Sequence, residues 1–459
     1  MHMGRSETVA FAASSLAGDP RTRAADRHGF SRWPRKICQA GIQLCSSSQG
    51  ASPSRGCVCS RSGISPSCAR RRIPTLGRMV GKYGGVAGST TETQSGARGR
   101  RPVILFVTAI AVTLETFVVP IAESLHDRGW TTIAAANEAS QVEGFDSTVD
   151  LPAFRREGIL AHVGAFWALV RTIRTVKPDV MHLNTPAAVL MGRLAGTITR
   201  VPSVSVILGT FLEPRSWLTF AYGFVESLSA RMSRVTVVLN EDDARFYRRV
   251  CGKGRILMAP AGGAGIDFDT SGQGSQRDAT RKVALFVGRL AADKNLDFLV
   301  QAWTAARRTC PDLVLRLVGS NVAGDPPWAR PEVPGIEFGP WTDDPLSEIL
   351  GATVFVSGSR REGFSLAVAE AVVAGVPVVA VDNRGTREIQ RRAGGAAITV
   401  VTCDCRLFAA AMIRAVSSST RPEFRKGLAE QWGREATVAF HVSVVEDHFE
   451  RSPIRRLAS

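Results

Sequence analysis

Short apolar runs alternate with amphipathic helix patterns along residues 101–459. Residues 102–108 have the pattern of a buried strand, residues 113–129 that of a helix, and residues 131–136 that of the next strand. A β-α-β start of this kind predicts a doubly wound parallel sheet. Further buried strands are expected at residues 178–182, 201–208, 283–288 and 354–357. The chain is therefore expected to adopt an α/β fold.

The last of these strands leads into a well-marked helix. Residues 358–361 are turn-like, and Ser365 is predicted to be the N-cap of a helix over residues 366–374. Gly375 ends the helix, and Pro377 begins the next apolar run. A strand, a turn and a helix in this order place a helix N-terminus at the carboxyl edge of the sheet.

That helix N-terminus has the features of an anion site. The backbone N–H groups of Phe364, Ser365 and Leu366 are expected to point toward one position. Glu362 lies in the loop beside this position, and Glu370 lies about a turn and a half into the helix. The two carboxylates could accept hydrogen bonds from hydroxyl groups on either side of a phosphate, as a sugar nucleotide requires. Two glutamates at this spacing are also common on solvated surfaces.

Two cations follow the strand over residues 283–288, which ends at Gly288. Arg289 and Lys294 precede a helix whose apolar side chains are expected to face inward, namely Leu296, Leu299, Val300 and Trp303. Ligands of open α/β sheets bind at the carboxyl ends of the strands, and Arg and Lys suit a diphosphate there. The alternative is that both cations only solvate a loop.

Together these segments resemble the retaining glycosyltransferases of family 4. The matching segments are Phe286-Val-Gly-Arg-Leu-Ala-Ala-Asp-Lys294, Glu362-Gly-Phe-Ser-Leu-Ala-Val-Ala-Glu370, Ala374-Gly-Val-Pro-Val-Val-Ala380, Gly385-Thr-Arg-Glu388 and Gly263-Ala-Gly-Ile-Asp267. The resemblance implies the GT-B fold, in which two Rossmann-like, doubly wound domains face a cleft. It places an acceptor domain at residues 101–268 and a nucleotide-sugar domain at residues 269–459, with C-terminal helices that return to the first domain.

The resemblance also implies roles for the matched residues. The predicted donor site consists of Gly288, Arg289, Lys294, Glu362, Gly363, Phe364, Ser365, Leu366 and Glu370. Arg289 and Lys294 would neutralise the departing diphosphate, so that neither a metal nor a cofactor is needed. Glu370 would hold the ribose, and Glu362 would position the sugar. The implied reaction moves a sugar, with retention of its anomeric configuration, to a glycan, a lipid-linked saccharide or a small metabolite in cell-envelope or exopolysaccharide synthesis.

The acceptor or sugar side is predicted at Thr113, His182 and Gly209. Members of the family often carry His-Gly where this chain has Leu208-Gly209, so a usual sugar contact and a candidate acid or base group are missing. Two alternatives stay open. One is a GT-B sugar-nucleotide epimerase, which needs no acceptor. The other, indicated only by Leu208, is a relative that binds a sugar nucleotide or a partner protein without catalysis.

A metal site is expected to be absent. Asp242-Asp243 and Asp343-Asp344 are adjacent pairs at helix starts, where the side chains point about 100° apart. Asp267-Phe-Asp269 has the spacing of an Asp-x-Asp pair, but it falls in the expected connection between the domains.

Net charge separates the first hundred residues from the rest. The chain carries +16 over 459 residues, but residues 1–100 hold 16 Lys and Arg against 4 Asp and Glu. The remainder is only mildly basic, so no nucleic-acid partner is expected.

Residues 1–100 are rich in Ser, Arg, Gly and Ala and lack helical or alternating periodicity, which predicts a disordered tail. Their cysteines lack paired CxxC spacing, so no zinc site is expected.

Residues 1–100 also bear on where the chain starts and on where the protein is located in the cell. No apolar core of a secretory signal follows the N-terminal charges, and no transmembrane helix is expected, which predicts a cytoplasmic protein. Met79 is an internal methionine, and a chain that starts near it is expected to fold and to keep donor binding.

Two amphipathic helices allow peripheral contact with the inner face of the plasma membrane. They cover residues 165–177 and 216–232 and carry Phe166, Trp167, Val170 and Ile173, and Trp217, Phe220, Phe224 and Leu228, respectively. Their apolar faces could lie on an anionic bilayer. Packing between helices and sheet is the interpretation that we favour.

Overall fold

The structure, a computed structural model, describes residues 100–152, 159–210, 217–268, 281–321, 328–418 and 424–450. The predicted tail, with Cys38, Cys45, Cys57, Cys59, Cys68 and Met79, lies outside the described residues except for Arg100. Asp269, the second residue of the only Asp-x-Asp candidate, and the side chain of Trp217 also lie outside them.

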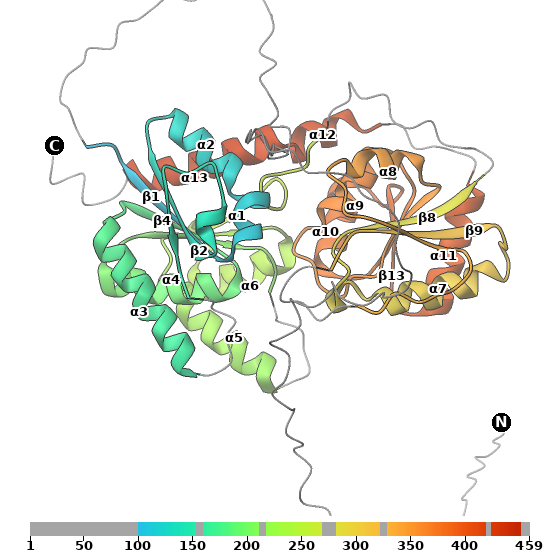
Figure 1. The fold of residues 1–459 in the computed structure, drawn as a ribbon, viewed down its shortest axis with the longest axis horizontal. Coiled ribbons are helices and arrows are strands. Elements are labelled where there is room, and N and C mark those ends of the chain that lie inside the picture. Colours follow the sequence, from blue (N-terminus) through green and yellow to red (C-terminus); the bar gives the residue numbers. More distant parts are fainter. Residues whose placement is uncertain are drawn as a thin grey trace, which may run out of the picture. The chain divides into compact units, whose positions relative to one another are not determined.

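The described residues form two parallel sheets with helices packed on them (Figure 1). The first sheet has the strand order β3-β2-β1-β4-β5-β6-β7. Its strands are β1 (Val103–Ile110), β2 (Thr131–Asn137), β3 (Ser147–Asp150), β4 (Val180–Asn184), β5 (Ser203–Ile207), β6 (Val235–Val238) and β7 (Ile256–Met258). In the middle of the sheet Leu105 stands opposite Ile133 on one side and Met181 on the other. β1, β4, β5 and β6 are buried almost throughout, which explains why they read as continuous apolar runs rather than alternating ones.

Helices cover both faces of this sheet. On one face lie α3 (Ile159–Val176), α4 (Pro186–Thr199), α5 (Trp217–Ala230) and α6 (Glu241–Cys251). On the other face lie α1 (Ala111–Phe117), α2 (Val119–Asp127) and the long C-terminal helix α13 (Arg434–Glu450). The end of α13 packs on the end of α2, where the rings of Phe449 and Trp130 meet edge to face at 4.8 Å. The last helix of the described residues therefore completes the core of the first sheet.

The single helix predicted for residues 113–129 is wrong. The chain forms α1 and α2 instead, with a break at Val118. Pro120 lies in the first turn of α2, where its missing N–H is tolerated, whereas the same residue inside a continuous helix would remove a hydrogen bond and clash with the preceding turn. The break brings Thr113 and Phe117 to the edge of the pocket described below.

The second parallel sheet has the strand order β10-β9-β8-β11-β12-β13. Its strands are β8 (Lys282–Val287), β9 (Leu313–Val318), β10 (Ile336–Gly339), β11 (Val354–Ser357), β12 (Val378–Val381) and β13 (Ile398–Val401). One face is covered by α7 (Leu296–Arg307) and α11 (Cys405–Ser417), and the other by α8 (Pro345–Gly351), α9 (Leu366–Val373), α10 (Arg384–Ala393) and α12 (Lys426–Trp432). The predicted domain boundary at residues 268 and 269 stays a prediction.

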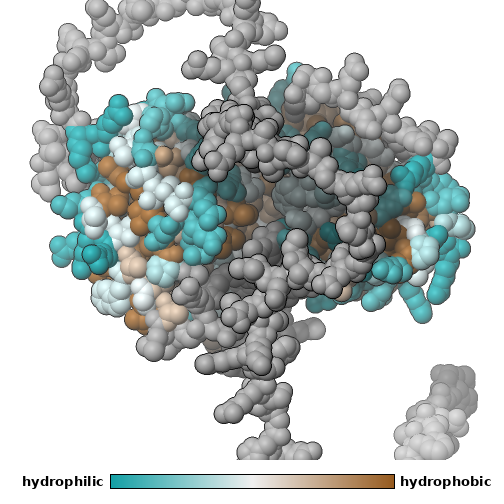
Figure 2. Space-filling model, in the orientation of Figure 1, coloured by the Kyte–Doolittle hydropathy of each residue, from teal (hydrophilic) through white to brown (hydrophobic). Residues whose placement is uncertain are grey.

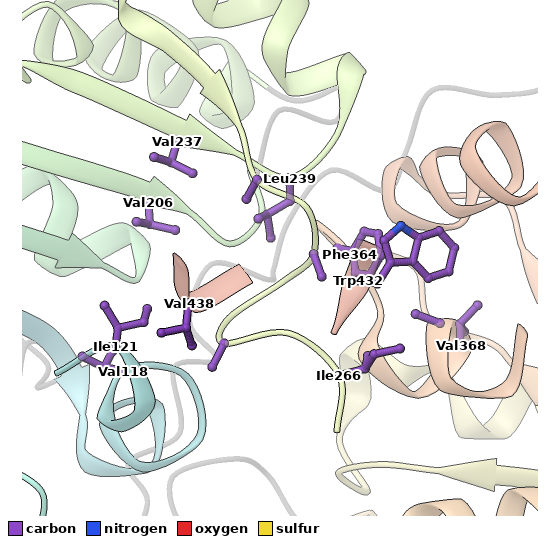
Figure 3. Close-up of a cluster of buried hydrophobic side chains, with 14 of the residues drawn as sticks. Val118, Ile121, Val206, Val237, Leu239, Ile266, Phe364, Val368, Trp432 and Val438 are labelled. Carbon is purple, nitrogen blue, oxygen red and sulfur yellow. The ribbon is translucent and has the colours of Figure 1, made fainter. Parts of the chain in front are cut away.

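The two connections between the sheets are hydrogen-bonded to each other. The backbone N–H of Ile266 donates to the carbonyl of Trp432 at 3.0 Å, and that of Arg434 donates to Ile266 at 3.0 Å. Trp432 is fully buried and meets the ring of Phe364 edge to face at 5.5 Å (Figure 3). A Cβ at Gly265, whose φ is +90°, would overlap the carbonyl of Gly433, so only glycine fits at this position of the predicted Gly-x-Gly-x-Asp signature.

Packing of the apolar faces of α3 and α5 into the core, the interpretation that we favoured, is wrong in part. Val170 and Ile173 of α3 are buried, but Trp167 of α3 and Phe220, Phe224 and Leu228 of α5 are exposed. For α5 the reason is the polar network beneath it, which joins Glu226 to Arg193 of α4. None of the helices in the described part of the chain is both long and apolar enough to cross a membrane.

Candidate functional site

A pocket of about 1100 Å³ is lined by loops that follow strands of both sheets. From the first sheet come the residues after β1, β4 and β5, and from the second sheet the residues after β8, β11 and β12. All these strands are parallel within their sheets, so the loops leave from carboxyl ends, where open α/β sheets bind their ligands.

Most of the predicted site residues line this pocket. They are Thr113, Gly209, Gly288, Arg289, Lys294, Glu362, Gly363, Phe364, Ser365 and Leu366. Among the described residues that line the pocket, His182 and Glu370 are not found. The structure thus brings together the cations after β8 and the turn before α9, although 67 residues of chain lie between Lys294 and Glu362.

Lys294 and Glu362 form an ion pair in the wall of the pocket. The Nζ of Lys294 donates to the Oε1 of Glu362 at 2.6 Å, and the two side chains are only 17% and 15% exposed. Lys294 ends a short helical turn (Ala292–Lys294), and its neighbour Asn295 has a left-handed φ of 55° that redirects the chain into α7. The ammonium has three N–H groups, so it can keep Glu362 and still donate to a phosphate oxygen.

Arg289 is the second cation of the pocket. Its guanidinium donates to the carboxylate of Asp293 at 3.0 Å, and both side chains are about one-third exposed, at 35% and 31%. Asp293 is joined to the other side of the pocket as well, because its carbonyl accepts from the backbone N–H of Arg360 at 3.1 Å. Arg289 therefore lines the pocket while its guanidinium is held by Asp293.

The N-terminus of α9 opens onto the same pocket. Ser365 is extended and occupies the N-cap position, as predicted, but in the described part of the chain its side chain makes no capping hydrogen bond. The first N–H groups of a helix lack intrahelical partners and carry the positive end of its dipole. With Lys294 and Arg289 they form a cationic wall of the pocket.

Gly363 allows the backbones of the two sheets' loops to touch. A Cβ at Gly363 would overlap the carbonyl oxygen of Leu208, so a larger residue would push the loops apart. The carbonyl of Gly363 accepts a hydrogen bond from the side chain of Asn240 at 3.1 Å. The position where the family often carries histidine is therefore in direct backbone contact with the predicted donor loop.

Glu370 lies further along α9 and is partly buried. Burial, and secondarily the nearby carboxylate of Asp267, raises the pKa of Glu370 from 4.5 to about 7. Its carboxyl group is thus poised to change charge near neutral pH, and hydrogen bonds donated by hydroxyl groups would favour the charged form.

His182 belongs to a buried histidine pair instead of the pocket. Its ring lies in β4 with 1% exposure, its Nδ1 is 3.0 Å from the amide nitrogen of Asn184, and its Nε2 is 3.4 Å from the Nδ1 of His441 in α13. Burial lowers the pKa of His441 to about 4 and that of His182 well below its ordinary value. Both rings are therefore neutral at neutral pH and help α13 to pack on the first sheet.

A polar cluster that was not predicted from the sequence includes three pocket-lining residues, Thr210, Arg384 and Arg387. Arg384, at the start of α10, bonds to Thr210 and to the buried Asp243 of α6. Arg387, one turn on, donates to Asp242 at 2.9 Å. The residues after β5, β6 and β12 all follow carboxyl ends of strands, where a ligand site is expected. The pairing of residues more than 130 positions apart, however, is not visible in one sequence.

Glu388 gives the Gly385-Thr-Arg-Glu388 segment a structural role. Its carboxylate accepts from Arg391, from Arg392 and, at 3.1 Å, from the backbone N–H of Glu241 at the start of α6. Arg392 in turn lies over the ring of Phe364 at 5.6 Å. This network ties α10 to the first sheet and supports the loop that carries Glu362.

No group of three or more His, Cys, Asp or Glu side chains gathers as metal ligands would within the described ranges. Asp344 is the N-cap of α8, where it accepts from Ser347 at 3.0 Å, and Asp243 is paired as described above. Asp267 is exposed and paired with Arg434 at 2.8 Å.

Comparison with known proteins agrees with this geometry. The profile of the "Glycosyl transferase 4-like domain" matches residues 113–262, and that of "Glycosyl transferases group 1" matches residues 281–418. A Bacillus subtilis (strain 168) protein with the name "Putative glycosyltransferase EpsD" is 24% identical over 63% of this chain and 81% of its own length. The GDP-mannose-dependent alpha-mannosyltransferase of Mycolicibacterium smegmatis is 30% identical over 48% of this chain and 60% of its own length.

Solved structures share the fold. HepE of Anabaena, crystallised with UDP and glucose, aligns with a TM-score of 0.59 at 16% identity over 76% of this chain and its own full length. Sucrose-phosphate synthase of Thermosynechococcus elongatus aligns with a TM-score of 0.57 at 17% identity over 77% of this chain. The architecture is thus the two-sheet GT-B fold, which defines the class of protein. The chain belongs to the family-4 type of GT-B glycosyltransferases.

Proposed function

We propose that this glycosyltransferase moves a sugar from a nucleoside diphosphate to the hydroxyl group of an acceptor, with retention of the anomeric configuration. The observation that carries the proposal is the cationic wall formed by Lys294, Arg289 and the N-terminus of α9 in one pocket. UDP and glucose in the HepE structure, and GDP-mannose in the name of the mycobacterial relative, support a nucleotide-sugar donor of this general kind.

The wall has the charge that the reaction needs. As the bond between the anomeric carbon and the diphosphate breaks, negative charge develops on the leaving oxygen. Lys294 and Arg289 then donate to the diphosphate, which stabilises the departing charge more than the ground state. The acceptor oxygen forms the new bond on the face that the diphosphate leaves, and its proton passes to the diphosphate oxygen. This balance needs neither a redox partner nor a metal.

Glu362 and Glu370 are proposed to bind the two ends of the donor. Glu362, held by Lys294, would accept hydrogen bonds from the sugar hydroxyls. Glu370, one helical turn beyond the pocket-lining Leu366, would accept them from the ribose. Thr113 and Gly209 line the pocket on the side of the first sheet, where we propose that the acceptor binds. A glycan, a lipid-linked saccharide or a small metabolite fits this reaction, in cell-envelope or exopolysaccharide synthesis at the cytoplasmic side.

A thermal-shift screen of nucleoside-diphosphate sugars against the full chain tests the donor. A matching donor raises the unfolding temperature because it binds only the folded state. Incubation of that donor alone, with analysis of the products, tests for an epimerase, which would give an isomeric nucleotide sugar. Incubation with candidate acceptors tests for catalysis. Donor binding with neither transfer to any acceptor nor hydrolysis would indicate a non-catalytic relative. A screen in which no nucleotide sugar shifts the unfolding temperature contradicts the proposal.

A further inference from the structure

Helix α5 turns its only charged residue inward. Glu226 is buried, and its carboxylate accepts from the guanidinium of Arg193 in α4 at 2.5 Å and from the hydroxyl of Tyr247 in α6 at 2.6 Å. Arg193 also donates to Ser229 of α5 at 3.2 Å and to Ser233 at 2.9 Å. This buried network sets the rotation of α5 about its own axis, so the opposite side of the helix must face outward.

The outward side of α5 is apolar along its length. Phe220, Phe224 and Leu228 recur at the spacing of one helical face and are 81%, 66% and 56% exposed. Val225, beside them, is 44% exposed. A surface helix normally has the opposite arrangement, with its apolar stripe toward the core. Large apolar side chains that are exposed together mark interaction surfaces.

The neighbouring helices extend this apolar surface. α4 contacts both α3 and α5, and all three cover the same face of the first sheet. Ile198 and Leu194 of α4 and Trp167 and Val163 of α3 are exposed. In Figure 2, brown and pale residues predominate over teal ones at the lower end of the part that carries α3. We call the exposed apolar residues of α3, α4 and α5 the three-helix surface.

The exposed charges of the three-helix surface are positive. Arg171 and Arg174 continue the stripe of Val163 and Trp167 along α3 and are exposed. Arg200 and Arg231, both exposed, directly follow α4 and α5. Glu226 is the only carboxylate on the three helices, and it is buried. The adjacent helix α6, by contrast, begins with three acidic residues.

We propose that the three-helix surface binds the surface of an anionic lipid bilayer. Aromatic and aliphatic side chains of such a face enter the boundary between headgroups and acyl chains, and each arginine near the surface gains attraction to anionic lipids. A second copy of the chain is a poorer occupant, because a two-fold contact would bring the same basic residues of both copies together. The proposal concerns docking and is independent of the donor chemistry.

Vesicle flotation with the full chain tests the apolar contribution. We expect the protein to float with vesicles of phosphatidylcholine and phosphatidylglycerol and to bind vesicles of phosphatidylcholine alone at least tenfold more weakly. The double variant Phe224→Ser, Leu228→Ser should lose at least tenfold in affinity for the anionic vesicles. Leu407→Ser, which changes a 55% exposed leucine of α11, is the matched control and should bind like the wild type. Equal binding of the double variant and the wild type overturns the proposal.

The basic residues 1–100 can also attract anionic vesicles, so a second measurement must report on position. Hydrogen–deuterium exchange of the wild-type full chain should slow in α3 and α5, but not in α11, when anionic vesicles are added. Arg171→Glu with Arg174→Glu should weaken vesicle binding at least fivefold at low salt, and the unchanged melting temperature of each variant shows that it is folded. Unchanged exchange in α5 overturns the proposal. A dimer in light scattering that Phe224→Ser with Leu228→Ser abolishes also overturns it, because a second copy of the chain would then occupy the surface.

Discussion

Replacement of Lys294 by Ala tests the cationic wall most directly. The Lys294 ammonium lies 2.6 Å from Glu362, and both side chains are largely withdrawn from water. Two unit charges about 4 Å apart interact by about 4 kcal/mol at an effective dielectric constant of about 20, and loss of one preorganised donor to a developing negative charge costs about 3–4 kcal/mol in measured cases. We therefore expect Lys294→Ala to lower kcat/KM by about 100-fold or more.

Lys294 could exert this effect in two ways, through the diphosphate or only through Glu362. A double-mutant cycle separates them. If Lys294 contacts the diphosphate, Lys294→Ala still lowers kcat/KM at least tenfold in a Glu362→Gln background. If it only positions Glu362, the double variant is no worse than Glu362→Gln alone. Initial rates of transfer, measured over a range of donor concentrations, give the values.

The matched control is Lys282→Ala, because Lys282 is an exposed lysine at the opposite end of β8. It should leave kcat/KM within twofold of the wild type. If Lys294→Ala does the same while remaining folded, the assignment of the diphosphate site to this wall is wrong.

Further predictions concern Glu370, the absence of a metal requirement, and the buried pair of Arg193 and Glu226. Because the folded-state pKa of Glu370 is raised to about 7 from 4.5, the ligand-free protein loses stability as pH rises between these two values. Glu370→Gln should therefore make the unfolding temperature less dependent on pH. The affinity for the donor should rise over the same pH range in the wild type and not in Glu370→Gln. If donor affinity changes with pH in the same way in both proteins, Glu370 does not bind the ribose. Transfer activity should survive excess EDTA, and complete loss that Mn²⁺ restores would reject the metal-free site. Glu226→Ala leaves the Arg193 charge buried without its partner and should lower the free energy of unfolding in urea by about 3–5 kcal/mol, whereas Arg193→Met with Glu226→Leu should cost much less. A loss below about 1 kcal/mol for Glu226→Ala would contradict this account of α5.

Local chemistry made the second sheet predictable. The strand predicted for residues 354–357 is β11, and the helix predicted to begin after Ser365 is α9. Apolar runs bounded by glycine and polar turns determine such elements almost alone, because a parallel strand is buried on both faces. The cations after β8 and the turn before α9 then meet, since neighbouring parallel strands place their carboxyl ends at one edge.

What could not be predicted depends on contacts between distant residues. The periodicity of α5 shows that the helix has an apolar stripe, but not which side faces the sheet, and the deciding pair, Arg193 and Glu226, is 33 residues apart. The bonds from Arg384 to Thr210 and Asp243 join loops of different sheets. Such pairings arise only when the whole fold is assembled, so no local pattern records them.

The contact between Gly363 and Leu208 bears on how this enzyme could change. The two loops meet through backbone atoms, and the requirement for glycine falls on residue 363. Residue 208 also lines the pocket, and its side chain packs against the buried cluster to which Phe364 belongs. The contact with Gly363 is made by the carbonyl group of residue 208, so it does not itself depend on whether that residue carries an aliphatic group or an imidazole. Substrate preference on this side of the pocket can diverge among descendants of one ancestor without a matching change in the scaffold.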